Sequence, residues 1–157
     1  MRIEQYERLT KQALALMESE KNLIANLSNL SALLNMELDE INWVGFYFVQ
    51  GQELVLGPFQ GLPACVRISV GYGVCGTAVE KKQVQRVSNV HQFKGHIACD
   101  SASNSEIVIP FKLGDCIAGV LDIDSPKLGR FGEIDEHGLT FLMSEVEKLL
   151  NSHAISA

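Results

Sequence analysis

Both ends of the chain carry apolar residues at the spacing of an amphipathic helix. Near the start, apolar residues recur every three or four positions in two runs: Ile3, Tyr6, Leu9, Ala13, Leu16 and Met17, then Leu23, Leu27, Leu30, Leu33 and Leu34. A similar run near the end comprises Ile134, Leu139, Phe141, Leu142, Val146, Leu149 and Leu150. Because an apolar stripe of this kind must be buried, we expect helices within 1–37 and over 133–151 that pack against the rest of the domain.

Between residues 41 and 124 the pattern changes to short runs rich in β-branched and aromatic residues, which strands favour. Six strands are predicted, within INWVGFYFVQ, ELVLGPF, CVRISV, QVQRVSNV, SEIVIPFKL and CIAGVLDID. Tight turns at Gln50–Gln52 and Gly114–Asp115 join two pairs of these strands, so the sheet is expected to be mainly antiparallel. VCGTAVEKK favours a short helix, and a long polar connection covers 91–103.

This order of elements predicts an α+β domain with a six-stranded, mainly antiparallel sheet. The N- and C-terminal helices would pack together on one face of that sheet. The other face would be left for the connection 91–103, with a ligand pocket beneath it. A chain of 157 residues fits one domain, so we expect a single domain over 1–157.

Charge and hydropathy exclude several classes of partner. The net charge is −6, from 19 acidic and 13 basic residues, whereas a nucleic-acid-binding protein needs a basic patch. The basic stretches at Lys81–Lys82 and Lys127–Arg130 are short and typical of solvated surface. No apolar run reaches the ~18 residues of a membrane span, and the first residues lack the apolar core of a secretory signal. We therefore expect a cytoplasmic protein that binds neither nucleic acid nor membrane.

The four cysteines are Cys65, Cys75, Cys99 and Cys116. None forms a C-x-x-C pair, and their gaps are too long for the paired ligands of a structural zinc site, so we expect no metal. In a reducing compartment, such thiols are either small buried hydrophobes or redox groups. Cys99 raises the question most sharply, because its polar stretch, HIACDSASNSEIVIP, gives no packing reason for a thiol.

Two further groups of side chains are predicted to share faces of the sheet. Asp122 and Asp124 are two positions apart on one strand, and Glu106 lies on the other strand of the same hairpin. Three converging carboxylates repel one another, so at least one is expected to keep its proton. Trp43 and Tyr47 also share a face and could form an aromatic wall. The alternative without a function is a solvated acidic edge for the three carboxylates and ordinary core packing for the two aromatic residues.

Several motifs together resemble a known family. IAGVLDIDSP and RFGEIDEHGL, within the helix–sheet–helix order, resemble a GAF domain. GVCGTAV, VQRVSNV, GHIACDSASNSEIVIP and GVLDIDS are similar to the free methionine-(R)-sulfoxide reductases, and the similarity covers nearly the whole chain. The resemblance implies reduction of free L-methionine-(R)-sulfoxide to methionine, without a cofactor. It also implies recycling of a disulfide by thioredoxin.

The resemblance also assigns roles to residues. It implies that Cys99 attacks the substrate, that Cys65 is the resolving thiol, and that Cys75 can take part in disulfides. It implies a substrate site formed by Trp43, Tyr47, Glu106, Asp122 and Asp124. Cys116 receives no role, and we expect it to be buried filler.

The chemistry fits these assignments but leaves choices open. A thiolate attacks the sulfoxide sulfur and becomes a sulfenic acid, which a second thiol converts to a disulfide. Cys75 begins a predicted helix, whose dipole would lower the thiol pKa, so Cys65 and Cys75 both remain candidates for the resolving thiol. Which carboxylate donates the proton is also open.

Other functions compete with the reductase. A GAF domain can be a non-catalytic sensor of a small ligand, and the same thiols could report oxidants as a redox sensor. The N-terminal apolar stripes are compatible with either core packing or a homodimer surface, and amphipathicity alone does not separate the two.

Overall fold

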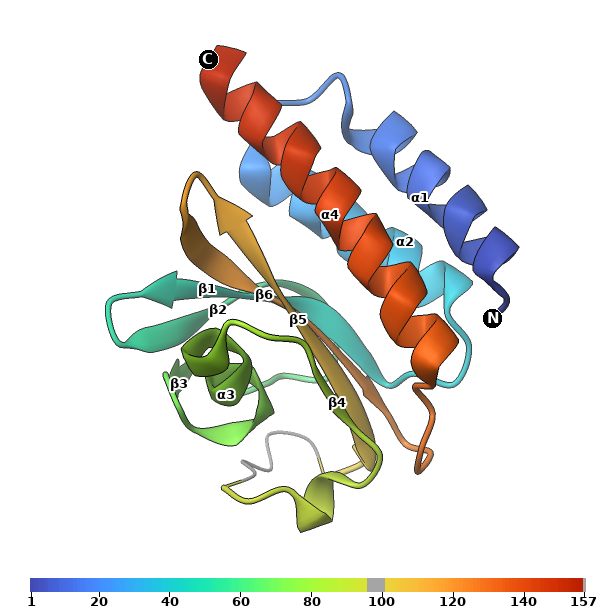
Figure 1. Ribbon diagram of the computed structural model, residues 1–157, viewed down its shortest axis with the longest axis vertical. Coiled ribbons are helices and arrows are strands. Elements are labelled where there is room, and N and C mark those ends of the chain that lie inside the picture. Colours follow the sequence, from blue (N-terminus) through green and yellow to red (C-terminus); the bar gives the residue numbers. More distant parts are fainter. Residues whose placement is uncertain (96–100, 157) are drawn as a thin grey trace.

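The computed structural model describes residues 1–95 and 101–156, and Figure 1 shows the arrangement of their elements. The helices are α1 (Ile3–Met17), α2 (Leu23–Glu37), α3 (Gly73–Lys81), the short 3₁₀ helix η1 (Val90–Gln92) and α4 (Glu133–Ser156). The strands are β1 (Trp43–Gln50), β2 (Glu53–Gly61), β3 (Arg67–Ser69), β4 (Gln85–Val87), β5 (Ser105–Leu113) and β6 (Cys116–Ser125).

The strands form one six-stranded sheet in the order β3-β2-β1-β6-β5-β4. Every neighbouring pair is antiparallel. The hairpins β1–β2 and β5–β6 are joined at the centre by pairing of β1 with β6, where Trp43 faces Asp124 and Gly45 faces Asp122. This central pairing brings the start of the sheet, with its aromatic residues, beside the acidic end of β6.

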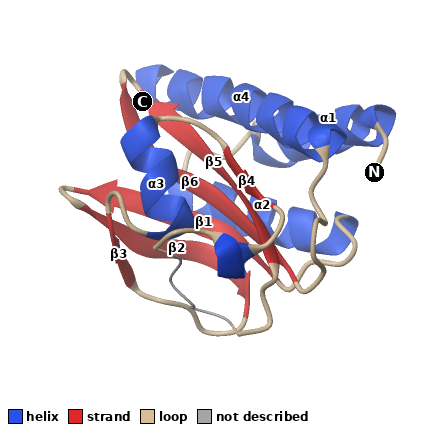
Figure 2. Cartoon of the chain, turned by 60° about the horizontal axis from the view of Figure 1, so that its bottom comes forward, coloured by secondary structure: helices blue, strands red, loops and turns tan. Residues whose placement is uncertain are grey.

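The two faces of the sheet carry different layers. The long helices α1, α2 and α4 gather on one side, and α3 lies on the other (Figures 1 and 2). The helices of the first side and the inward residues of β1, β5 and β6 form one apolar core, which includes Leu34, Val44 and Leu142. A second core between α3 and the sheet includes Trp43 and Tyr47. The predicted α+β fold, with both terminal helical regions on one face, is therefore confirmed.

Some boundaries differ from the sequence-based expectation. The edge strand β3 contains three residues, because it pairs only with Glu53–Val55 of β2. Cys65 therefore precedes the strand in which we expected it, and Val66 is 60% exposed. The closing helix α4 continues to Ser156, beyond the predicted end at 151.

The expectation for Cys116 was wrong. This residue is exposed, because it begins β6 directly after the turn at 114–115, at the tip of the hairpin.

Among the described residues, no helix combines the length and the apolar character that a membrane span requires.

Candidate active site

The three predicted carboxylates converge on the α3 side of the sheet. Glu106 of β5 pairs directly with Asp124 of β6, and Asp122 lies two positions further along the same strand. Glu106 is 7% exposed and Asp122 is 5% exposed, whereas Asp124 is half-buried. The period of two along a strand and the register of one hairpin are sufficient to bring these acids together.

The electrostatics of this cluster favour a retained proton. Burial raises the pKa of Glu106 well above its ordinary value of 4.5. The negative charges of Asp122 and Asp124, and hydrogen bonds between these side chains and Glu106, raise the pKa further. Burial is the largest cause, because an ionised carboxylate loses its hydration there. The sequence predicted mutual repulsion, but it did not indicate how deeply Glu106 lies.

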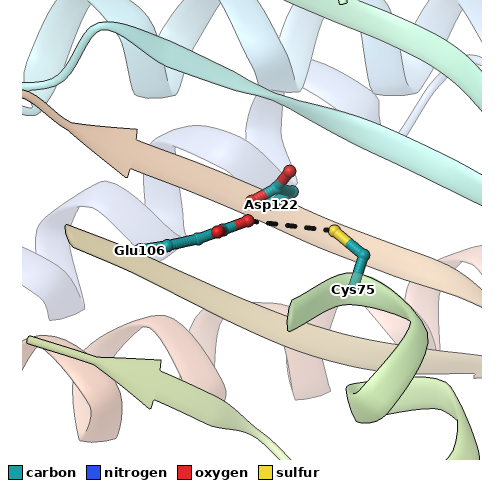
Figure 3. Close-up of side chains that lie close together, drawn as sticks. All are labelled: Cys75, Glu106 and Asp122. Carbon is teal, nitrogen blue, oxygen red and sulfur yellow. Dashed lines mark hydrogen bonds between the residues drawn. The ribbon is translucent and has the colours of Figure 1, made fainter. Parts of the chain in front are cut away.

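Cys75, in the first turn of α3, faces the same cluster (Figure 3). Its Sγ lies 4.0 Å from Oε2 of Glu106, and the side chain is buried. Burial raises the pKa of this thiol well above its usual value, and the charges of Asp122, Glu106 and Asp124 raise it further. Our expectation of a lowered pKa was wrong, because desolvation and three nearby acids outweigh the dipole of a nine-residue helix.

Within the described residues, the side chains of Cys75, Glu106 and Asp122 lie close enough together to hold a metal ion. The ligand atoms of Cys75, Glu106 and Asp122 all lie within 4.8 Å of one another. Residue spacing could not have predicted this group, because Cys75 reaches the acids only through the packing of α3 on the sheet.

An aromatic stack forms the neighbouring wall. The rings of Trp43 and Tyr47 are stacked, with centroids 5.9 Å apart, and Phe59 stacks on Trp43 at 5.2 Å. Phe59 pairs with Gly45, where a Cβ would lie 2.3 Å from the Phe59 Cβ. Sequence reasoning missed Phe59, although its strand and its facing glycine were both visible in the sequence. Since Trp43 also pairs with Asp124, the wall adjoins the acids.

The segment 62–66, between β2 and β3, lies against this wall. The indole Nε1 of Trp43 donates to the carbonyl of Leu62 at 3.1 Å, and the hydroxyl of Tyr47 donates to the carbonyl of Cys65 at 2.8 Å. Cys65 is disulfide-bonded, whereas Cys75 and Cys116 are free thiols. The burial of Tyr47 and its acidic neighbours raise the pKa of the phenol, so this hydroxyl remains a donor.

Cys99 lies outside the described residues. On the near side, the carbonyl of Gly95 accepts a hydrogen bond from the amide of Gly73 at the start of α3. On the far side, the amide of Asn104 donates to the carbonyl of Ser125 at the end of β6. Both ends of the stretch that contains Cys99 are therefore hydrogen-bonded to elements that carry the acid cluster and Cys75.

A cavity of about 310 Å³ opens at the edge of the sheet. Its lining consists of Gln85, Arg86, Val87, Ser88, Asn89, Gln92 and Phe93. None of the predicted site residues lines this cavity. It is adjacent to the acid cluster, since Val87 pairs with Glu106.

Comparison with known proteins shows which family the sequence and the fold resemble. The GAF domain family matches residues 6–150. The "Free methionine-R-sulfoxide reductase" of Escherichia coli is 57% identical over 145 residues, which are 92% of this chain and 88% of the relative. A structure described as reduced fRMsr of Staphylococcus aureus has a TM-score of 0.89 at 57% identity, covering 92% of this chain and 94% of the other.

A second solved structure shows a substrate complex. It is the free methionine-R-sulfoxide reductase of Neisseria meningitidis in complex with its substrate, with a TM-score of 0.92 at 40% identity. The match covers 97% of this chain and 92% of the other.

Proposed function

Because this chain belongs to the GAF domain family and, within it, to the free methionine-R-sulfoxide reductases, we propose that it reduces free L-methionine-(R)-sulfoxide to methionine by thiol chemistry. The observation that carries the proposal is the acid cluster of buried Glu106 and Asp122 and half-buried Asp124, beside the stacked rings of Trp43 and Tyr47. Such a site combines negative charge for an ammonium group, a held proton for an oxygen and an apolar wall for an S-methyl group.

The first step assigns the nucleophile to Cys99. Its thiolate attacks the sulfoxide sulfur, the oxygen is transferred, and the products are methionine and a cysteine sulfenic acid. The reaction is balanced as thiol plus sulfoxide giving sulfenic acid plus thioether. The sulfoxide oxygen gains negative charge as the S–O bond polarises, so a hydrogen bond from a neutral acid stabilises the transition state. Glu106 is suited to this role because burial and the charges of Asp122 and Asp124 raise its pKa, which favours the protonated form.

The second step assigns the resolving thiol to Cys65. The Cys65 thiol attacks the sulfenic sulfur, a disulfide forms, and the oxygen leaves as water. Two observations favour Cys65 over Cys75. Cys65 is disulfide-bonded, and Cys75 is a buried free thiol whose raised pKa disfavours the thiolate. An external dithiol protein, which we propose to be thioredoxin, then reduces the disulfide by thiol–disulfide exchange.

Selectivity for a free amino acid follows from the same cluster. The negative charges of Asp122 and Asp124 would pair with the α-ammonium group of the substrate. In a peptide this ammonium is an amide, so the buried charges would lose their partner and the complex would be strongly destabilised.

The test replaces Cys99 with serine and uses Cys116→Ser as the matched control. Cys116 is an exposed free thiol on the same chain, so both variants lose one sulfur atom. With free methionine-(R)-sulfoxide and a dithiol reductant, Cys99→Ser should release no methionine above background, and Cys116→Ser should match the unmodified protein. Full activity of Cys99→Ser would refute the assignment of the nucleophile.

A further inference from the structure

We infer that Tyr47 and Trp43 are positioning residues for the resolving cysteine, because their polar atoms fasten the segment 62–66 to the central strand of the sheet. This inference rests on the proposed function and deepens it. The aromatic wall of the site then has two tasks. Its ring faces line the substrate site, and its hydrogen-bond donors hold Cys65 in place for the second step.

The contacts of the segment support this role. Between Gly61, where β2 ends, and Arg67, where β3 begins, the backbone follows no strand pairing. Trp43 donates to the carbonyl of Leu62 and Tyr47 donates to that of Cys65, so the two bonds hold both ends of 62–65. The next carbonyl, that of Val66, accepts from the amide of Leu56 at 2.9 Å.

The donors themselves are held rigidly. Trp43 and Tyr47 are each 2% exposed and belong to β1, which pairs with β2 on one side and β6 on the other. Stacking of Phe59, Trp43 and Tyr47 fixes the planes of the rings. A buried phenol or indole N–H that lost its acceptor would incur the desolvation cost of an unmade hydrogen bond. These rings therefore favour one position of the segment over others.

The position of Cys65 matters because a disulfide has narrow geometric limits. The two Cα atoms must approach to about 4.4–6.8 Å before the sulfurs can bond. The Tyr47 bond is present while Cys65 is disulfide-bonded, so it stabilises the geometry that closure requires. In the closing reaction the Cys65 sulfur bonds to the sulfenic sulfur, and the hydroxyl leaves as water with the thiol proton. The sulfoxide substrate is the sole oxidant.

The test uses Tyr47→Phe, which removes one oxygen atom and keeps the stacked ring. Reduced protein receives one equivalent of free methionine-(R)-sulfoxide without reductant, in the presence of dimedone. Dimedone captures the sulfenic acid that has not yet closed, so mass spectrometry of captured and bridged chains gives the partition between capture and closure. Loss of one hydrogen bond should shift this partition about five- to tenfold toward capture. Trp43→Phe, which removes the bond to Leu62, should shift it in the same direction.

Tyr6→Phe is the matched control. Tyr6 is buried on the helical face to the same extent as Tyr47, and its hydroxyl donates to Asp135, so the variant removes the same atom from an equally buried side chain. Its partition should equal that of the unmodified protein. A Tyr47→Phe partition that is unchanged, or a Tyr6→Phe partition that shifts equally, would overturn the inference. Failure of the proposed function would look different, because no variant and no unmodified protein would release methionine.

Discussion

Replacement of Glu106 by glutamine should change how the stability of the protein depends on pH. Glutamine has nearly the shape of a glutamic acid side chain and keeps an N–H donor, but it does not ionise. Glu106 is 7% exposed, and its pKa is raised in the folded state by burial and by the charges of Asp122 and Asp124. At pH values between the unfolded pKa and the folded pKa, the folded protein therefore retains a proton on Glu106 that the unfolded chain has lost.

The sign and size of the effect follow from proton linkage. A group whose folded pKa is raised contributes its full stability below the unfolded value of about 4.5. This stability is lost as the pH rises toward the folded pKa, at about 1.4 kcal/mol per pH unit for one proton. The Glu106→Gln variant does not lose stability in this way, because glutamine has no proton to release in this pH range. The variant should therefore gain stability relative to the unmodified protein by close to that amount for each pH unit in this window.

The assay is urea denaturation of the reduced, substrate-free proteins at pH 5, 6, 7 and 8. Fluorescence of Trp43, the single tryptophan of the chain, reports unfolding directly beside the site. Glu7→Gln, at an exposed position on α1, is the control for the substitution of a carboxylate by an amide. A difference between Glu106→Gln and the unmodified protein that stays constant from pH 5 to pH 8 would refute the reasoning.

Three other predictions concern the wall, the substrate and the thiols. Gly45→Ala places a Cβ 2.3 Å from that of Phe59 and should destabilise the protein by roughly 1–3 kcal/mol, seen as a lower urea midpoint; an unchanged midpoint would show that the wall is not tightly packed. N-acetylated methionine sulfoxide lacks the ammonium group and should lower kcat/KM at least about 100-fold, because a buried charge pair is lost; equal turnover would exclude ammonium binding by the acids. Cys75→Ser should retain the disulfide of Cys65 after one turnover, as read by peptide mapping, whereas absence of that bridge would assign resolution to Cys75.

Local rules were sufficient for much of the fold. Helical spacing located the terminal helices, and short turns predicted the β1–β2 and β5–β6 hairpins. The convergence of Glu106 with Asp122 and Asp124 followed from one hairpin and a side-chain period of two. These features depend on neighbours in the chain, which a single sequence displays.

Features that depend on long-range packing could not be derived in this way. The pairing of β1 with β6 joins segments far apart in the sequence, and no local pattern specified it. The pKa of Cys75 was predicted in the wrong direction because the helix dipole was visible in the sequence, whereas burial against the acids was not. Cys116 was expected inside because cysteine is often buried, but the exposed tip of a hairpin determines its environment.

The most direct measurement of the central claim is a single turnover of the reduced protein with each epimer of free methionine sulfoxide, without reductant. For the R epimer we predict one methionine per chain, the loss of two thiols, and a peptide in which Cys65 is bridged to Cys99. The S epimer should give none of these products. Failure of the R epimer to release methionine, or release without loss of thiols, would contradict the account.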